Sequence, residues 1–211
     1  MSIYFLIFYK NRAMKRIIKI IIISFIIIIP CLYILTPIKK IYNKIEYLTF
    51  NTDNSINPKY DSILRLYANQ RFVLIDYSLP STKKRLWVID NDSIILHTYV
   101  SHGMNSGFRY ATDFSNTPKT NKSCIGKFKT LNSYHGKHGL SMRIQGLDAT
   151  NNNAYSRNIV FHSADYVEYT FLIKHGYLGR SLGCFVTPKR DNEKIIKLAT
   201  EKKSISVIVV N

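Results

Sequence analysis

Residues 71–100, RFVLIDYSLPSTKKRLWVIDNDSIILHTYV, contain three runs that are rich in β-branched and aromatic residues. Turn residues separate the runs, as at Asn91-Asp92, and this alternation is typical of β-strands joined by tight turns. The runs cover residues 71–77, 85–90 and 93–100. The stretch therefore predicts one strand followed by a β-hairpin, and it makes the fold class mainly β.

Further strands and two helices are expected on both sides of this hairpin. Asn57-Pro58 has the pattern of a helix start, and Ile63, Leu66 and Tyr67 give residues 58–69 one apolar face. A second helix is expected over 189–202, after a Thr187-Pro188 cap, with Ile195, Ile196 and Ala199 buried. The remaining strands are predicted at 140–147, 157–162, 182–187 and 206–210, and the loops at 101–139 and 163–180. One domain, a β-sheet or sandwich with two small helices, accounts for this order.

The N-terminal part has the pattern of a membrane-targeting segment. Ile20–Leu35 reads IIIISFIIIIPCLYIL, sixteen residues without a charge, and basic residues precede it, as expected on the cytoplasmic side. Small residues suited to cleavage are missing from the end of the run, although MKRIIKI from Met14 resembles the start of a signal peptide. We expect an uncleaved transmembrane anchor over 1–36, with a cleaved signal as the alternative. A stalk over 37–57 and a domain over 58–211 outside the cytoplasm follow.

Composition narrows the classes of protein further. The chain has 211 residues, 46% apolar and 20% charged, which is enough for one buried core and too short for two full catalytic domains. Its net charge is +17, of which residues 50–211 carry +10 from 22 cations and 12 anions. Either a lysine-rich background composition or attraction to anionic wall polymers or lipid headgroups explains this charge. An exported domain without a recognised nucleic-acid module is not expected to bind nucleic acid.

Cys184 is the residue with the most informative surroundings. It ends Gly179-Arg180-Ser181-Leu182-Gly183-Cys184, where glycines allow backbone N–H groups to approach a substrate carbonyl and Arg180 favours the thiolate. His162 ends a predicted strand, and a Cys–His pair is the minimum for nucleophilic acyl transfer. Two alternatives remain, a buried structural cysteine with a structural histidine, and a disulfide between Cys124 and Cys184.

The other histidines carry weaker signals. His102 follows the hairpin's second strand and is a candidate for the wall of the same cleft. His135 and His138 lie in YHGKHG, where no carboxylate or cysteine completes a metal site, so we expect loop structure or substrate contact. No metal and no cofactor are predicted.

The order of six stretches resembles the murein L,D-transpeptidase catalytic domain family, a branch of the YkuD-type cysteine transpeptidases. The family's signature is a His-Gly or His-Ser followed some twenty residues later by Ser-x-Gly-Cys, here His162-Ser163 and Ser181-Leu182-Gly183-Cys184. Leu182 and Val186 depart from the broader pattern, which has a second histidine and an Asn or Arg at these positions. The matching stretches are IDYSLPSTKKRLWVID (75–90), VSHGMNSG (100–107), FSNTPKTNKSCIGKFKT (114–130), YHGKHGLSMRIQGLD (134–148), NNNAYSRNIVFHSADYV (151–167) and GRSLGCFV (179–186).

The resemblance implies both a fold and a reaction. The fold would be an L,D-transpeptidase-like β-sandwich or barrel with two or three short helices, mainly β (α+β). The reaction would cross-link peptidoglycan: Cys184 attacks the L–D bond of a stem peptide, His162 is the base, Ser163 orients the imidazole through its carbonyl, and amides around Gly183 hold the oxyanion. Candidate substrate contacts are Arg180, Ser181, His102, Tyr134 and Gly136. The alternatives are a catalytically silent wall-binding module and a cysteine carboxypeptidase or amidase of the cell wall.

Overall fold

The computed structural model describes residues 12–50 and 55–211, which fall into two compact units divided between residues 42 and 43. Helix α2 (Arg12–Phe50) begins in the first unit, and all of its isoleucines from Ile17 to Ile29 are exposed. None of the helices in the described residues is both long and apolar enough to cross a membrane. Part of the expected anchor, residues 1–11, and of the expected stalk, residues 51–54, lies outside the described residues.

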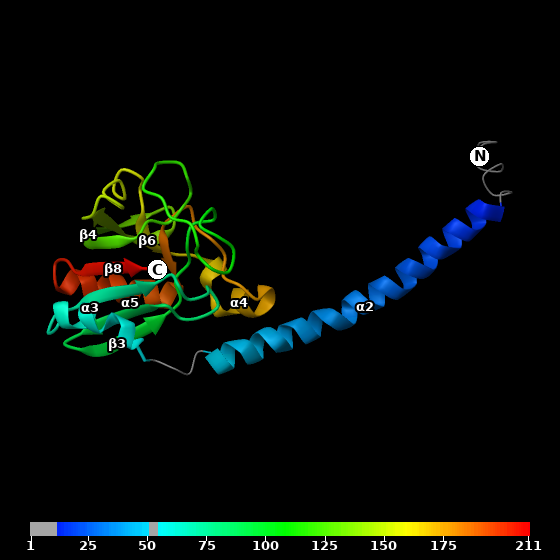
Figure 1. The fold of residues 1–211 in the computed structure, drawn as a ribbon, viewed down its shortest axis with the longest axis horizontal. Coiled ribbons are helices and arrows are strands. Elements are labelled where there is room, and N and C mark those ends of the chain that lie inside the picture. Colours follow the sequence, from blue (N-terminus) through cyan, green and yellow to red (C-terminus); the bar gives the residue numbers. More distant parts are fainter. Residues whose placement is uncertain (1–11, 51–54) are drawn as a thin grey trace. The chain divides into compact units, whose positions relative to one another are not determined.

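The second unit is built on one eight-stranded sheet (Figure 1). The strand order is β3-β2-β1-β8-β4-β5-β6-β7, so the last strand of the sequence lies in the middle of the sheet. Two pairs, β1 with β8 and β6 with β7, are parallel, and the other pairs are antiparallel. The strands are β1 (Phe72–Asp76), β2 (Leu86–Asp90), β3 (Ser93–Thr98), β4 (Gly126–Gly136), β5 (Gly139–Gly146), β6 (Val160–Ser163), β7 (Phe185–Thr187) and β8 (Ser206–Val210).

The sheet curls so that its two halves share one core. Val73 and Ile75 of β1 lie in the same buried cluster as Phe161 of β6 and Phe185 of β7, although these strands belong to different halves of the sheet. Helix α5 (Lys189–Glu201) adds Ile195, Ile196 and Ala199 to this cluster, as the sequence predicted. The expected mainly β, barrel-like class is therefore confirmed.

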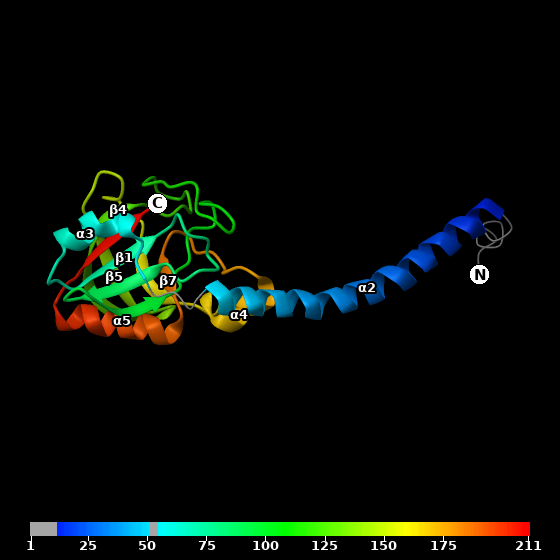
Figure 2. The same cartoon turned by 60° about the horizontal axis from the view of Figure 1, so that its bottom comes forward.

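A smaller layer covers the outer face of β1, β2 and β8 (Figure 2). Asn57 begins it as expected, because its side chain accepts a hydrogen bond from the Lys59 amide at 2.9 Å. The predicted helix over 58–69 is shorter in the structure, a 3-10 turn η1 (Pro58–Tyr60) followed by α3 (Asp61–Leu66). Tyr60 is buried there instead of Leu66, which is 63% exposed.

Two elements occur where loops were predicted. Strand β4 occupies the end of the expected 101–139 loop, and a 3-10 turn η2 (Asp165–Val167) and helix α4 (Tyr169–His175) lie within the expected 163–180 loop. The polar strand GKFKTLNSYHG buries Phe128 and Thr130 on alternate positions, so its period of two is carried by few apolar residues. Hairpin β2–β3 and strand β8 agree with the sequence predictions.

Candidate active site

The turn before β7 presents Cys184 through hydrogen bonds of its own residues. Ser181 Oγ donates to the Cys184 carbonyl oxygen at 2.8 Å and accepts from the Gly183 amide at 3.1 Å. Gly183 has φ 118°, and a Cβ there would come within 2.8 Å of the Lys122 carbonyl oxygen, so only glycine fits. The strand predicted from Leu182 therefore begins only at Phe185, and Leu182 is 65% exposed.

In this turn Gly183 and Ser181 have other roles than the sequence predicted. The Gly183 amide, expected as an oxyanion donor, is used by Ser181 within the turn. Ser181, expected as a substrate contact, is buried, and its hydroxyl closes the turn. Both residues therefore act on the position of Cys184.

Parallel pairing of β6 and β7 brings the thiol and an imidazole to one face. His162 lies opposite Val186, and Phe161 lies opposite Phe185, whose side chain enters the core. Cys184 comes just before β7 and packs in the same cluster as Val186, the register partner of His162, so the thiol and His162 lie on the same side of the sheet. Cys184 is half-buried, and its Sγ donates to the Asn158 carbonyl oxygen at 3.6 Å.

His162 is held in one tautomer. Its Nδ1 lies 3.0 Å from the carbonyl oxygen of Ser163, which only accepts hydrogen bonds, so Nδ1 carries the proton and Nε2 keeps a lone pair. This is the carbonyl contact that the resemblance implies for the residue after the histidine. Burial lowers the pKa of His162 below 6.5, with a smaller lowering from His138 and an opposing effect of the Ser163 carbonyl. The side chain is 4% exposed, so the resting imidazole is neutral and able to accept a proton.

The Cys184 thiol is also neutral at rest. Burial raises its pKa above 9, and the Val160 amide and the charge of Arg157 oppose that rise. A raised thiol pKa beside a lowered imidazole pKa disfavours a resting thiolate–imidazolium pair. The arrangement therefore suits proton transfer to His162 at the moment of attack rather than a pre-ionised nucleophile.

The guanidinium that acts on Cys184 is Arg157, whereas the sequence pointed to Arg180. Arg157 donates to the Ser115 and Lys122 carbonyl oxygens, both at 2.6 Å, on the wall next to Gly183. Arg180 donates to the carbonyl oxygens of Met104 and Gly107 at 3.3 and 3.2 Å and lies over the Phe108 ring. Arg180 therefore fixes the neighbouring loop. Both arginines lie in matching stretches, and only the fold distinguishes them.

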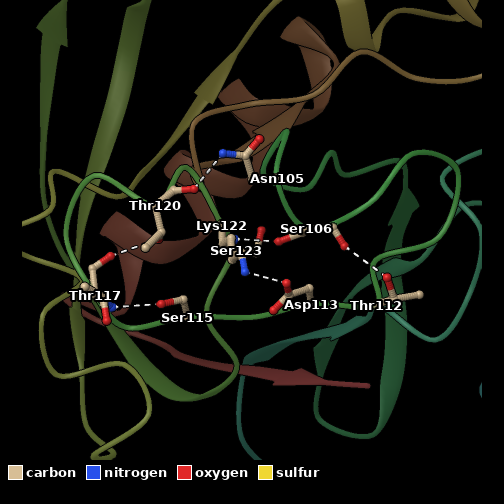
Figure 3. A network of polar contacts seen from close by, with 9 residues as sticks. All are labelled: Asn105, Ser106, Thr112, Asp113, Ser115, Thr117, Thr120, Lys122 and Ser123. Carbon is tan, nitrogen blue, oxygen red and sulfur yellow. Dashed lines mark hydrogen bonds and ion pairs between the residues drawn. The ribbon is translucent and has the colours of Figure 1, made fainter.

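Residues 101–125 form a wall that is held together by its own polar side chains (Figure 3). Ser106 Oγ accepts from the Ser123 amide at 2.8 Å, and Lys122 pairs with Asp113. Asn105 donates to the Thr120 carbonyl oxygen at 2.9 Å, which ties the two arms of the loop together. A Cβ at Gly183 would lie 2.8 Å from the Lys122 carbonyl oxygen, so this wall lies directly against the turn that carries Cys184.

His102 belongs to the support of this wall, and its expected role as a substrate contact is wrong. Its side chain is 0% exposed, and its Nδ1 accepts from Arg85 Nη2 at 2.8 Å while Nε2 donates to the Gly107 carbonyl oxygen at 3.3 Å. Burial and the Arg85 charge lower its pKa to about 4. A buried, neutral ring with both nitrogens bonded cannot reach a stem peptide.

The β4–β5 hairpin brings a further residue to the site. His138, at the hairpin end, stacks on His162 with ring centroids 4.4 Å apart and planes at 25°. Tyr134 lies under the Arg143 guanidinium, 5.0 Å from its ring, and exposed Gly136 leaves room for that ring. These two expected substrate contacts therefore shape the hairpin that carries His138.

Tyr166 was missed by the sequence reasoning. It packs in the same partly buried cluster as Cys184, and burial together with Cys184 raises its pKa to about 12. Gly179 leaves room for its side chain, because a Cβ at Gly179 would lie 2.5 Å from Tyr166 Cβ. The stretch HSADYV contains this tyrosine, but nothing in its sequence indicates that the side chain packs near Cys184.

The alternative disulfide is absent, since Cys124 and Cys184 are both free thiols. Cys124 is buried in the core, and burial raises its pKa to about 11. Among the described residues no group of three or more His, Cys, Asp or Glu side chains is placed to hold a metal ion.

A protected thiol beside a base with one available nitrogen is the arrangement of a cysteine acyltransferase. Residues 44–208 match the family of L,D-transpeptidase catalytic domains. The chain belongs to this family, as its resemblance suggested. A search of curated proteins found no match.

Several solved structures are similar at low sequence identity. They include the carbamoyl enzyme of Ldtfm with avibactam (18% identity, 67% of this chain and 49% of that chain, TM-score 0.42). The L,D-transpeptidase of Xylanimonas cellulosilytica (12%, 74% and 72%, TM-score 0.44) and a mutant of the Enterococcus faecium L,D-transpeptidase (15%, 67% and 50%, TM-score 0.42) are others. The chain spans about half the length of the first and third of these structures.

Proposed function

We propose that the protein is a peptidoglycan L,D-transpeptidase with Cys184 as nucleophile and His162 as general base. The observation that carries this proposal is the shared face of Cys184 and His162, with Nδ1 fixed by the Ser163 carbonyl and Nε2 left to accept a proton. Family membership supports the reaction class.

The reaction begins with transfer of the Cys184 proton to His162 Nε2. The sulfur attacks the carbonyl carbon of the bond between the third residue of a stem peptide, usually diaminopimelate, and its terminal D-alanine. The C–N bond breaks, the D-alanine nitrogen takes the proton from His162, and a thioester remains. Each backbone amide that bonds the oxyanion contributes about 3 kcal/mol.

An amine of a second stem peptide resolves the thioester. His162 takes a proton from this amine as its nitrogen attacks, the C–S bond breaks, and the proton returns to the sulfur. The product is a cross-link, whereas water in place of the amine gives a carboxypeptidase. The bonded wall of residues 101–125 supports the cross-link, because a rigid wall limits access of water.

We also propose that the catalytic unit works outside the cytoplasm, tethered by its N-terminal helix. The uncharged run Ile20–Leu35 and the basic residues before it support this location. Exposed isoleucines on α2 are consistent with a helix that contacts lipid. The +10 charge of residues 50–211 would favour anionic wall polymers or headgroups. Protease treatment of intact cells, with spheroplasts as control, tests the proposal: a catalytic unit cleaved only after lysis would contradict it.

Purified muropeptides incubated with the full chain in detergent test the reaction. Dimers and released D-alanine are expected from the native chain and from Cys31→Ser, a change at an exposed position of α2. Cys184→Ala should yield neither product while remaining folded. Shorter monomers without dimers would indicate a carboxypeptidase or amidase, and unchanged muropeptides that still bind would indicate a silent wall-binding module.

A further inference from the structure

The end of the β4–β5 hairpin is a short turn with little freedom. Gly136 pairs with Gly139 across the two strands, so only Lys137 and His138 connect them. Neither Lys137 nor His138 has a positive φ, whereas Gly139 has φ 74°, so the turn is of the kind in which a glycine in the left-handed region follows the two turn residues. The position of His138 is therefore set by the register of the hairpin.

The stem of the hairpin is held by an arginine between two aromatic rings. The Arg143 guanidinium lies 5.0 Å from the centroid of Tyr134 and 5.5 Å from that of Tyr155. Cation–π contacts of this kind contribute to keeping a strand in place. Strand β5, which carries Arg143, also pairs with β6 at Met142–Phe161, next to His162. The hairpin is thus attached to the strand of the catalytic base.

Two contacts define the orientation of the His162 ring. The Ser163 carbonyl oxygen accepts a hydrogen bond from Nδ1 at 3.0 Å, and the His138 ring stacks on one face with the two centroids 4.4 Å apart. His138 itself is exposed, whereas His162 is 4% exposed. A hydrogen bond alone leaves the ring free to tilt about that bond, and a stacked ring restricts the tilt.

We propose that His138 is a positioning residue: stacked on His162 from the hairpin turn, it holds the imidazole in the plane in which Nε2 takes the Cys184 proton. The inference rests on the proposed function and extends it to a residue on another strand pair. His138 contacts His162, not the reacting sulfur, so its effect is exerted through the base.

The stacked His138 ring also affects the pKa of His162 through its charge. The groups that act on His162 are the Ser163 carbonyl, which favours its protonated form, and His138, whose charge disfavours it. Burial, the largest effect, also disfavours the protonated form and lowers the His162 pKa. Loss of the His138 ring would remove the charge effect and admit water, and both changes raise the pKa of His162.

Alkylation of Cys184 by iodoacetamide tests this inference without any wall substrate. The full chain in detergent is alkylated between pH 5 and 9, and the modified peptide is quantified by mass spectrometry. We expect His138→Ala to slow alkylation at pH 8 about tenfold and to move the acid limb of the profile to higher pH. His138→Phe keeps a stacked ring without a charge, so its rate at pH 8 should stay within about twofold while its acid limb still moves.

His135→Ala is the matched control, because His135 is exposed in the same hairpin and pairs with Leu140. It should leave the rate and the profile unchanged. A native profile in His138→Ala, or equal losses in His135→Ala and His138→Ala, would overturn the inference. If the alkylation profile shifts in His138→Ala but the native chain forms no muropeptide product, the proposed function is refuted and the positioning role of His138 stands. If the native chain forms dimers but His138→Ala is alkylated like the native chain, the positioning role is refuted and the proposed function stands.

Discussion

His102 and His162 are both buried histidines, but their ring nitrogens differ in the hydrogen bonds that they make. His102 lies in the segment after β3, His162 lies within β6, and each is almost fully buried. His102 uses both ring nitrogens, one for Arg85 and one for the Gly107 carbonyl, whereas His162 uses Nδ1 alone for Ser163. Burial alone therefore does not distinguish the structural histidine, His102, from His162, the proposed base. The uncommitted nitrogen, on the face of a thiol, makes that distinction.

Substitution of each histidine by asparagine should give the largest contrast. His162→Asn removes the proposed general base, and we expect muropeptide cross-linking to fall about 100- to 10,000-fold with little loss of stability. His102→Asn should mainly lower the urea midpoint, because it leaves Arg85 and the Gly107 carbonyl with altered partners. The two variants are compared by their rates of product formation, each divided by the folded fraction. Equal losses of this rate in both variants would contradict the distinction between His162 and His102.

Arg85 offers the next largest effect. Its guanidinium is fully buried and donates to the Val100 and Leu79 carbonyl oxygens and to His102 Nδ1. Arg85→Met would orphan these acceptors, and we expect the free energy of unfolding to fall by about 3–5 kcal/mol. Urea titrations measure this change. A loss below about 1 kcal/mol would mean that the wall does not depend on Arg85.

Acid should weaken the folded state through His102. Its pKa is near 6.5 when unfolded and about 4 when folded, so between these pH values the unfolded chain binds more protons. Stability is therefore fully present above pH 6.5 and falls by about 3 kcal/mol as pH drops towards 4. The lowered His162 pKa acts in the same direction. The urea midpoint should therefore be lower at pH 4.5 than at pH 7.5. His102→Asn should make the difference between these two midpoints smaller. An unchanged difference would exclude His102 as its main source.

Arg157 and Arg180 give the smallest contrast. Because Arg157 opposes the raised pKa of the Cys184 thiol, Arg157→Met should slow alkylation of Cys184 about three- to tenfold at pH 8. Arg157→Lys keeps the charge and should recover most of the rate. Arg180→Met should slow alkylation less than Arg157→Met, since Arg180 bonds the loop at Met104 and Gly107. The opposite order would return Arg180 to the role that the sequence suggested.

The sequence predicted elements whose side chains follow a strong period and missed those that do not. Hairpin β2–β3 and helix α5 have continuous apolar patterns and agree with the structure. Strand β4 carries lysines and polar residues on its exposed positions, and α4 is only seven residues long, so neither produced a recognisable pattern.

In the candidate site, too, the sequence predicted residues that belong to a local motif and missed residues that long-range packing brings there. Motif spacing singled out Cys184 and His162, and the structure places His162 in β6 and Cys184 just before β7, its parallel neighbour. The contacts of His138, Arg157 and Tyr166 with this pair depend on hairpin register, loop path and ring packing. Such long-range features have no local signature, and for the same reason the sequence assigned His102 to the cleft when Arg85 holds it in the interior.

The central position of β8 has a consequence for synthesis. Strand β1 pairs with residues 206–210, about 130 residues later in the chain, and β8 also supplies the other neighbour of β4. Until the ribosome has released that segment, the two halves of the sheet have no common strand and the barrel cannot close. A nascent chain of this kind therefore cannot complete its sheet before the end of its translation.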